Sequence, residues 1–379
     1  MNSRPSILLE VYLLVCAGIV YGSLFPFWFH FDLHPQAVPG FLASWRDVNS
    51  FSDILGNVGL FVPYGYSARL LALRSPQRGR ALRLLLGGIL LAVCCQSGQL
   101  FIPGRDPSIA DVYSNSAGIA LGWVAARLLP LGTGSELLGG NPRRQLTLVI
   151  ALAWVLCQLL PLVPTIDLQV WKDSLRPLLY YPRVHWHETV LGLFAWLTCF
   201  HLLQFRVGLR LGVVQLSGFV LALLLLKVLI VANYLAFNAT LGLLVAAALW
   251  PLLGARLSPQ PLAWLLLGAF ALYALAPLEL RPAPRDFGWL PFSGYLQGSM
   301  LVNAIALCRK VFIFGALALL LLVDQPAPMR RALLIVGTLA ALEVLQRWVG
   351  LGTPALTDPL LFIAMAWLIQ RRLRHTANA

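Results

Sequence analysis

The chain consists of long apolar runs separated by short polar connectors. A run of about 20 apolar residues is long enough to cross a bilayer as a helix, and twelve such runs occur, several of them interrupted by Pro or Gly. They cover residues 6–25, 53–73, 84–101, 109–129, 146–163, 186–205, 211–232, 239–255, 261–280, 302–323, 331–350 and 359–373. This pattern predicts an all-α polytopic membrane protein with about 12 transmembrane helices.

The composition supports this prediction, because 59% of the 379 residues are hydrophobic and only 11% are charged. A soluble protein needs far more polar surface. The net charge of +13 resides largely on arginines in short connectors, which is typical of cytoplasmic membrane loops, so we expect no nucleic-acid partner. The 6 cysteines lie within apolar runs and match no metal or redox spacing, and we expect free thiols, no metal and no cofactor.

The distribution of cations predicts the orientation in the membrane. With the N-terminus in the cytoplasm, most connector arginines fall on the cytoplasmic side, as the positive-inside rule requires. The sequence therefore predicts a multi-pass protein of the bacterial cytoplasmic (inner) membrane with both termini cytoplasmic. The connector at 102–108 then faces the outside.

Two stretches of the chain share a pattern. QLFIPGRDPSIADVY begins at Gln99 and QRWVGLGTPALTDPL begins at Gln346, with Asp111 and Asp358 equally far along. Each stretch follows one apolar run and opens the next, and LKVLIVANYLAFNATLGLL from Leu226 has a similar layout. These similarities predict three repeated four-helix units, at 1–130, 146–255 and 261–373, of which the middle one is a degenerate copy.

The polar residues around the first stretch form a motif. They are Gln96, Gln99, Pro103, Arg105, Ser108, Asp111, Asn115, Gly118 and Gly122, with Asn57, Phe61, Pro63 and Gly65 on the second run. The motif resembles that of the VanZ-like family, named for a teicoplanin-resistance membrane protein, over about 1–130 and more weakly over 280–373. Gln96 stands where the family usually has an acid, and Gly352 of the last unit stands where Arg105 would.

Candidate ligand-binding residues follow from this motif. In the first unit they are Arg105, Asp111, Asn115, Gln96, Gln99 and Asn57, and in the last unit Glu343, Gln346 and Asp358. Ser108 and Asp111 are spaced as at a helix start, and the fork of Arg105 suits a carboxylate or a phosphate. Two interpretations stay open: a clasp that ties the loop to the helix end, or an outward pocket for an anionic headgroup.

Ionisable residues inside the later runs suggest further contacts. Glu343 is deep enough in its run to need a partner, and we expect it to pair with Arg309 or Lys310. Lys227 is expected either to pair with Glu188 or to extend toward the interface. The sequence HWHE at 185–188 does not suit a metal, because ligands two residues apart on a helix do not face one another.

The resemblance implies a role at the cell envelope. We expect binding of a membrane lipid or lipid-linked saccharide at the outer leaflet, with an effect on surface composition or glycopeptide-antibiotic access. The alternative is a lipid or small-solute transporter or flippase, since many spans and internal repeats are common in transporters. An enzyme using Asp111, Glu343 or Asp358 is less expected, because no recognisable nucleophile or metal motif occurs.

Overall fold

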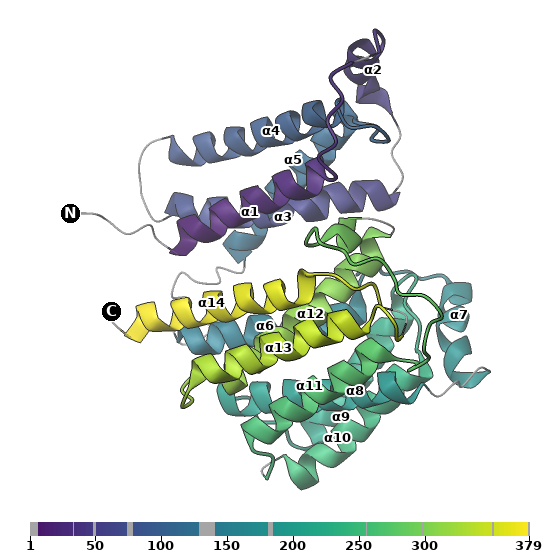
Figure 1. The fold of residues 1–379 in the computed structure, drawn as a ribbon, viewed down its shortest axis with the longest axis vertical. Coiled ribbons are helices and arrows are strands. Elements are labelled where there is room, and N and C mark those ends of the chain that lie inside the picture. The colour runs from purple at the N-terminus through teal and green to yellow at the C-terminus, as the bar shows by residue number, and fades with distance from the viewer. Residues whose placement is uncertain are drawn as a thin grey trace. The chain divides into compact units, whose positions relative to one another are not determined.

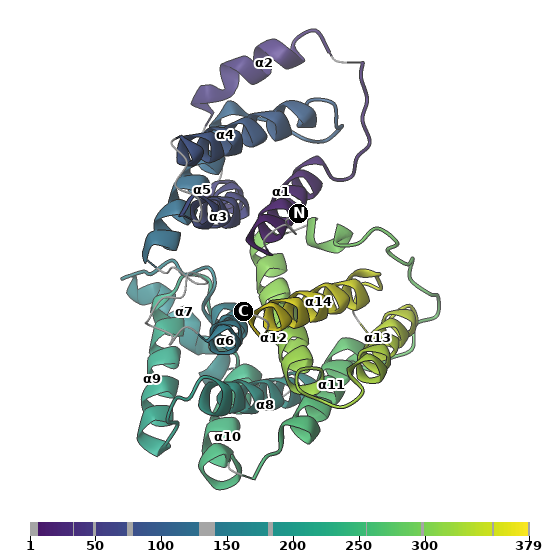
Figure 2. The same cartoon turned by 90° about the vertical axis from the view of Figure 1, so that its left-hand side faces the viewer.

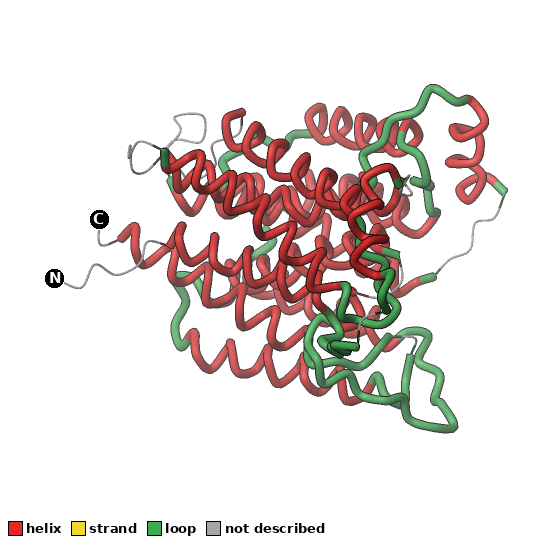
Figure 3. The backbone as a smooth tube through the Cα atoms, turned by 90° about the horizontal axis from the view of Figure 1, so that it is seen from above, coloured by secondary structure: helices red, strands yellow, loops and turns green. Residues whose placement is uncertain are grey.

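The regular structure of the protein is helical (Figure 3). The computed structural model describes residues 7–377 except 33, 48–50, 74–78, 129–140, 181–184, 255, 297–298 and 351. Within this part of the chain the extended segments form only isolated bridges between connectors. The contacts divide the chain into two compact units, Met1–Gly140 and Asn141–Ala379, so the second unit contains both later sets of predicted spans.

The described residues of the first unit form four long helices and two short ones. Its helices are α1 Ile7–Leu24, α2 Ala37–Ala43, η1 Ser44–Arg46, α3 Phe51–Leu73, α4 Arg80–Gln99 and α5 Ile109–Leu128. The long helices coincide with the first four predicted spans, and they run alongside one another (Figure 1). The short α2 and η1 belong to the connector between α1 and α3, where no element was predicted.

Glycines bring α3 and α5 into close contact. A Cβ atom added at Gly122 would lie 2.0 Å from the carbonyl oxygen of Val62, and one at Gly118 would lie 2.3 Å from that of Val58. From the other side, a Cβ at Gly65 would lie 2.0 Å from the carbonyl oxygen of Ile119. Small residues allow helix backbones to approach in this way inside a membrane, so these glycines hold the two helices that carry Asn57 and Asp111 together.

In the part of the second unit that the structure describes there are eight long helices and a short amphipathic one. They are α6 Pro142–Leu159, α7 Leu168–Leu179, α8 Trp186–His201, α9 Val213–Leu229, α10 Phe237–Leu253, α11 Pro259–Leu275, α12 Met300–Leu321, α13 Pro328–Leu345 and α14 Thr357–Ala377, with η3 Leu202–Arg206 extending α8 and η4 Ser293–Leu296 preceding α12. Every one of the eight later predicted spans coincides with a long helix. The remaining helix, α7, lies in the connector between α6 and α8.

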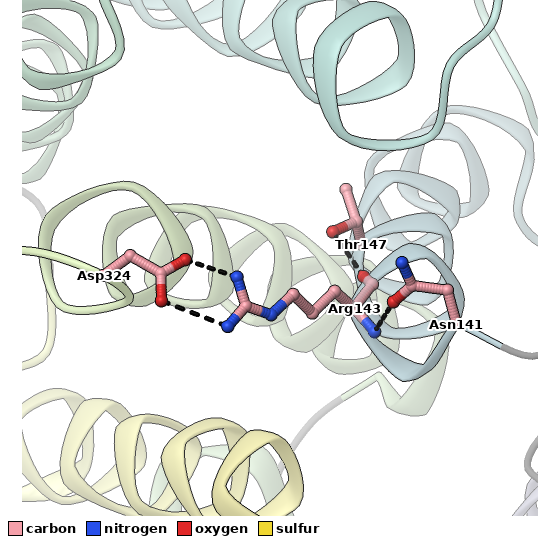
Figure 4. A network of polar contacts seen from close by, with 4 residues as sticks. All are labelled: Asn141, Arg143, Thr147 and Asp324. Atoms are coloured by element: carbon pink, nitrogen blue, oxygen red, sulfur yellow. Dashed lines mark hydrogen bonds and ion pairs between the residues drawn. The ribbon is translucent and has the colours of Figure 1, made fainter. Parts of the chain in front are cut away.

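A continuous apolar core joins the helices of the second unit. Within it, α6, α12 and α14 lie side by side (Figure 2). Trp154 of α6 packs against Trp196 of α8 and Phe312 of α12, with ring centroids 5.7 and 5.2 Å apart. At the start of α6, Arg143 forms a bidentate ion pair with Asp324 of the α12–α13 connector, at 2.5 and 3.1 Å (Figure 4). The pair is half-exposed, so it contributes little to the stability of the unit.

Several helices are suited to a membrane. Arg80–Gln99, Trp186–Arg206 and Leu301–Leu321 are both long and apolar enough to cross one, and Leu8–Leu24, Val213–Leu229, Phe237–Leu253 and Pro259–Leu275 are apolar but shorter. Large apolar side chains also point outward in the middle of helices, for example Leu90, Leu121 and Leu221, which are 63%, 55% and 60% exposed. Exposed apolar side chains in the middle of long helices favour contact with lipid. Spanning by all twelve helices stays a prediction.

The same type of turn follows α1, α6 and α11. In each, a residue with positive φ follows a proline and donates its N–H to the carbonyl three residues earlier: Phe27 to Leu24, Leu162 to Leu159 and Leu278 to Leu275, at 2.9, 3.0 and 2.9 Å. The peptide bonds before the three prolines are cis. The same backbone geometry therefore ends the first helix of each predicted four-helix unit.

Candidate functional site

The N-terminus of α5 is held by two serines. Ser108 accepts a hydrogen bond on Oγ from Ala110 N at 3.0 Å, and Ser44 Oγ accepts from Ile109 N at 2.9 Å. The hydroxyl of Ser108 in turn donates to the carbonyl of Ser44 at 3.1 Å. These bonds satisfy N–H groups that a helix start leaves unpaired. Ser108 was expected here, whereas Ser44 was missed because its connector shows no periodic pattern.

The end of α4 and the following loop are tied to their neighbours by polar side chains. The buried Gln96 accepts on Oε1 from Ser108 N at 3.3 Å, which links α4 to the start of α5. Gln99 donates from Nε2 to the carbonyl of Ser23 at 2.9 Å, and Arg105 donates from one terminal amino group to the carbonyl of Phe25 at 3.0 Å. Gln96, Gln99 and Arg105 thus join α4, the α5 start and the end of α1.

A second polar group lies between α3 and α5. Asn57 donates from Nδ2 to Asp111 Oδ1 at 2.6 Å, so the carboxylate in the first turn of α5 is bound to the second long helix. One turn further along, Asn115 is only 2% exposed, and its Oδ1 is a buried acceptor without a hydrogen-bond partner in the described part of the chain. A buried acceptor in that state is rare in proteins.

Five of the six predicted residues of the first unit therefore fall into two bonded groups. Asn57 and Asp111 bond to each other, while Gln96, Gln99 and Arg105 bond to backbone atoms of the neighbouring segments. The clasp interpretation accounts for these bonds. It does not account for Asn115 Oδ1, and the convergence of all six residues in one outward-opening pocket stays a prediction.

The last four helices repeat these contacts with other side chains. The buried Glu343 of α13 accepts on Oε2 from Ala355 N at 2.8 Å, as Gln96 accepts from Ser108 N. Gln346 donates from Nε2 to the carbonyl of Ala274 at 3.2 Å, as Gln99 donates to that of Ser23. In both cases the amide reaches the last turn of the first helix of the set.

The buried charges of the last four helices pair differently from our expectation. Lys310 Nζ lies 2.5 Å from Asp358 Oδ1, and Arg309 bonds to the hydroxyl of Tyr273, so neither cation forms an ion pair with Glu343 among the described residues. The predicted pairing of Glu343 is wrong because Asp358 and Tyr273 bind the two cations, while the backbone N–H of Ala355, just before α14, binds the carboxylate of Glu343. In the connector before α12, burial raises the pKa of Tyr295, partly offset by the charge of Lys310.

The middle four helices hold a third pair of this kind. Asn238 of α10 donates from Nδ2 to Glu188 Oε2 of α8 at 3.2 Å, and its Oδ1 accepts from His185 N at 2.8 Å. Glu188 therefore bonds to Asn238, whereas the sequence had suggested Lys227 as its partner. Among the residues that the structure describes, no group of three or more His, Cys, Asp and Glu side chains could hold a metal ion.

Lys227 itself is 9% exposed, and it lines a cavity together with Gln158 and Thr240. The cavity measures about 10 Å³, which is close to the room that one water molecule needs. It is too small for a lipid headgroup, so the middle set offers no competing site in this place.

Comparison with known proteins gives one match. The model of the VanZ/LLP1 family matches residues 10–130. The match covers α1 to α5 and confirms the family expected for this region, while the weaker resemblance over 280–373 stays a prediction. No curated protein and no solved structure matches the chain.

Proposed function

Because its first unit is VanZ-like, we propose that this is an integral membrane protein of the bacterial cell envelope that binds the headgroup of a lipid or lipid-linked saccharide. Binding takes place at the outer leaflet and alters the composition of the cell surface or the access of glycopeptide antibiotics. The family match, the apolar helices and the polar groups at one end of α4 and α5 support this proposal.

The observation that carries the proposal is the state of Arg105. Its guanidinium is half-buried, and the one bond described for it goes from a terminal amino group to the carbonyl of Phe25. None of the ion pairs among the described residues involves Arg105. A guanidinium held in place by a backbone carbonyl keeps its other N–H groups for a phosphate or a carboxylate, which it binds in a bidentate fork.

The proposal includes a topology. We place twelve helices across the cytoplasmic membrane with both termini in the cytoplasm, which puts Arg105 on the outside. The excess of arginines in the other connectors supports this orientation. The polar residues of the first unit then lie at the level of the outer headgroups.

We further propose that the three sets of four helices are copies of one unit. The recurring turn supports this, and so do three bonds that join the second and fourth long helix of each set: Asn57–Asp111, Glu188–Asn238 and Lys310–Asp358. In each set, a side-chain amide also donates a hydrogen bond to the backbone carbonyl that lies three residues before the proline of the turn. Gln99 reaches Ser23, Asn233 reaches Gln158 and Gln346 reaches Ala274, at 2.9, 2.8 and 3.2 Å.

Mass spectrometry of the lipids that co-purify with the full-length protein tests the proposed function. Wild type should retain a specific lipid or lipid-linked saccharide, and Arg105→Gln should lose it while still inserting into the membrane. Arg127→Gln is the matched control, because it removes the same charge from an exposed position at the other end of α5. An unchanged lipid profile in Arg105→Gln contradicts the proposal and leaves the clasp interpretation.

A further inference from the structure

We propose that the connectors after α11 and α13 form a second anion site, in which Arg281, Arg285 and Arg347 bind the phosphate of an anionic phospholipid headgroup. The site belongs to the second unit, outside the region that the family model matches. It shares the membrane placement of the proposed function but does not depend on Arg105.

Backbone pairing brings the three arginines together. Arg281 N donates to the carbonyl of Trp348, and Arg285 N donates to that of Arg347, both at 2.8 Å. Leu280 and Val349 form an isolated antiparallel bridge beside the first of these bonds. The positions of the arginines are therefore set by main-chain hydrogen bonds rather than by flexible side chains.

Each of the three side chains is then oriented by a backbone carbonyl. Arg281 donates from Nε to Gly350 O at 3.0 Å, Arg347 donates from Nε to Arg285 O at 3.1 Å, and Arg285 donates to Gly352 O. Because Arg281 and Arg347 use only Nε in these bonds, their terminal amino groups are left to bind a ligand. All three side chains are half-exposed, so a ligand can reach them.

The cluster concentrates like charges. None of the ion pairs among the described residues involves Arg281 or Arg347, although the exposed carboxylates of Glu279 and Asp286 lie in the same connector. Burial and the neighbouring charge of Arg281 lower the pKa of Arg285. Positive charges held close together by the backbone favour an anion between them, and guanidinium groups match phosphate oxygens in geometry.

In the first unit, the connectors after α1 and after α4 are also joined by an arginine. There the N–H of His30 donates to Phe101 O at 2.7 Å, as that of Arg281 donates to Trp348 O. Arg105 reaches from the connector before the last helix back to Phe25 O, whereas Arg285 reaches forward to Gly352 O. Arg285 thus provides the guanidinium that the sequence lacks at Gly352, from the opposite connector.

Apolar side chains around the cluster favour a lipid over a soluble anion. Leu280 is 81% exposed and Trp289 is 75% exposed, and Trp348 is 39% exposed with its ring 5.1 Å from the guanidinium carbon of Arg347. Exposed Trp beside Arg is typical of a surface at headgroup level, where the ring meets the acyl chains and the cation meets the phosphate.

Native mass spectrometry of the full-length protein tests the site. The protein in detergent is titrated with phosphatidylglycerol, with phosphatidylcholine, or with phosphatidylglycerol in the presence of sodium phosphate. The double variant Arg281→Gln/Arg347→Gln should bind phosphatidylglycerol roughly 25-fold more weakly at one site, from about fivefold for each of the two basic residues near a lipid surface. Arg281→Lys/Arg347→Lys should retain most of the binding, which separates loss of charge from disturbance of the loop.

Arg256→Gln/Arg330→Gln is the charge-matched control, because both arginines are exposed and precede α11 or lie in the first turn of α13. It should bind as wild type. Arg105→Gln should still bind phosphatidylglycerol at the Arg281/Arg285/Arg347 site. The number of bound lipids therefore distinguishes loss of this site from loss of the proposed site at Arg105. Undiminished binding by the double Gln variant, equal binding of both lipids by wild type, or full displacement by millimolar phosphate would overturn the proposal.

Discussion

Lys310 Nζ lies 2.5 Å from Asp358 Oδ1, and in the first unit Asn57 donates to Asp111, which likewise lies in the first turn of its helix. Asn57 is a neutral donor and Lys310 is a cation, and in both cases the acceptor is an acid at the start of the last helix of the set. The bond between the second and fourth long helices is therefore constant, and the charge around it varies.

The Lys310–Asp358 pair should be essential for folding of the last four helices. The Lys310→Met variant leaves the carboxylate of Asp358, a residue only 5% exposed, without its cation. We expect a loss of roughly 3–5 kcal/mol in the free energy of unfolding, the usual effect of breaking a buried pair from one side. Thermal unfolding in detergent measures this. Lys310→Met/Asp358→Asn should recover most of the stability, and if it is no more stable than the single variant, the pair is not the cause.

Close packing of α3 and α5 should make Gly122 intolerant of any side chain. A Cβ at this position would lie 2.0 Å from Val62 O, so Gly122→Ala must push the two helices apart. We expect a clear fall in the unfolding temperature and in the yield of monodisperse protein. Gly59→Ala, on the same pair of helices, meets nothing within 4 Å and should be neutral or slightly stabilising. Equal effects of the two substitutions would disprove the packing argument.

Asn115 should separate stability from binding. Asn115→Leu keeps the number and branching of the side-chain heavy atoms and removes the buried acceptor that has no described partner, so stability should be unchanged or higher by about 1 kcal/mol. Lipid retention should fall, because a ligand would lose the acceptor. Parallel thermal unfolding and lipid analysis check both results. A less stable variant with normal lipid retention would assign Asn115 to the structure alone.

The orientation can be tested with membrane-impermeant maleimide on intact cells. On a background without the native cysteines, Asp106→Cys in the α4–α5 loop should be labelled, whereas Arg127→Cys at the other end of α5 should react only after the cells are opened. Both positions are exposed, so reactivity reports the side of the membrane. The reverse pattern would show that the site faces the cytoplasm.

Much of the fold was predictable from the sequence, because apolar runs as long as 302–323 have few alternatives to a helix. The capping role of Ser108 was predictable from its spacing to Asp111. The pairing of Lys310 was not predictable from the sequence, because both Glu343 and Asp358 were possible acidic partners. The packing of α12 against α14 places Lys310 beside Asp358. Arg285 was missed for a related reason. Its guanidinium donates a hydrogen bond to the carbonyl of Gly352, and the two residues lie in connectors that are far apart in the sequence.

The central claim is that Arg105 holds a lipid headgroup on the outside of the membrane. A phospholipid with a photoactivatable group in its headgroup, added to the outer leaflet and mapped by peptide mass spectrometry after illumination, tests it directly. We predict crosslinks to residues 102–108 that disappear in Arg105→Gln and persist in Arg127→Gln. Crosslinks of equal yield in wild type and Arg105→Gln would contradict the claim.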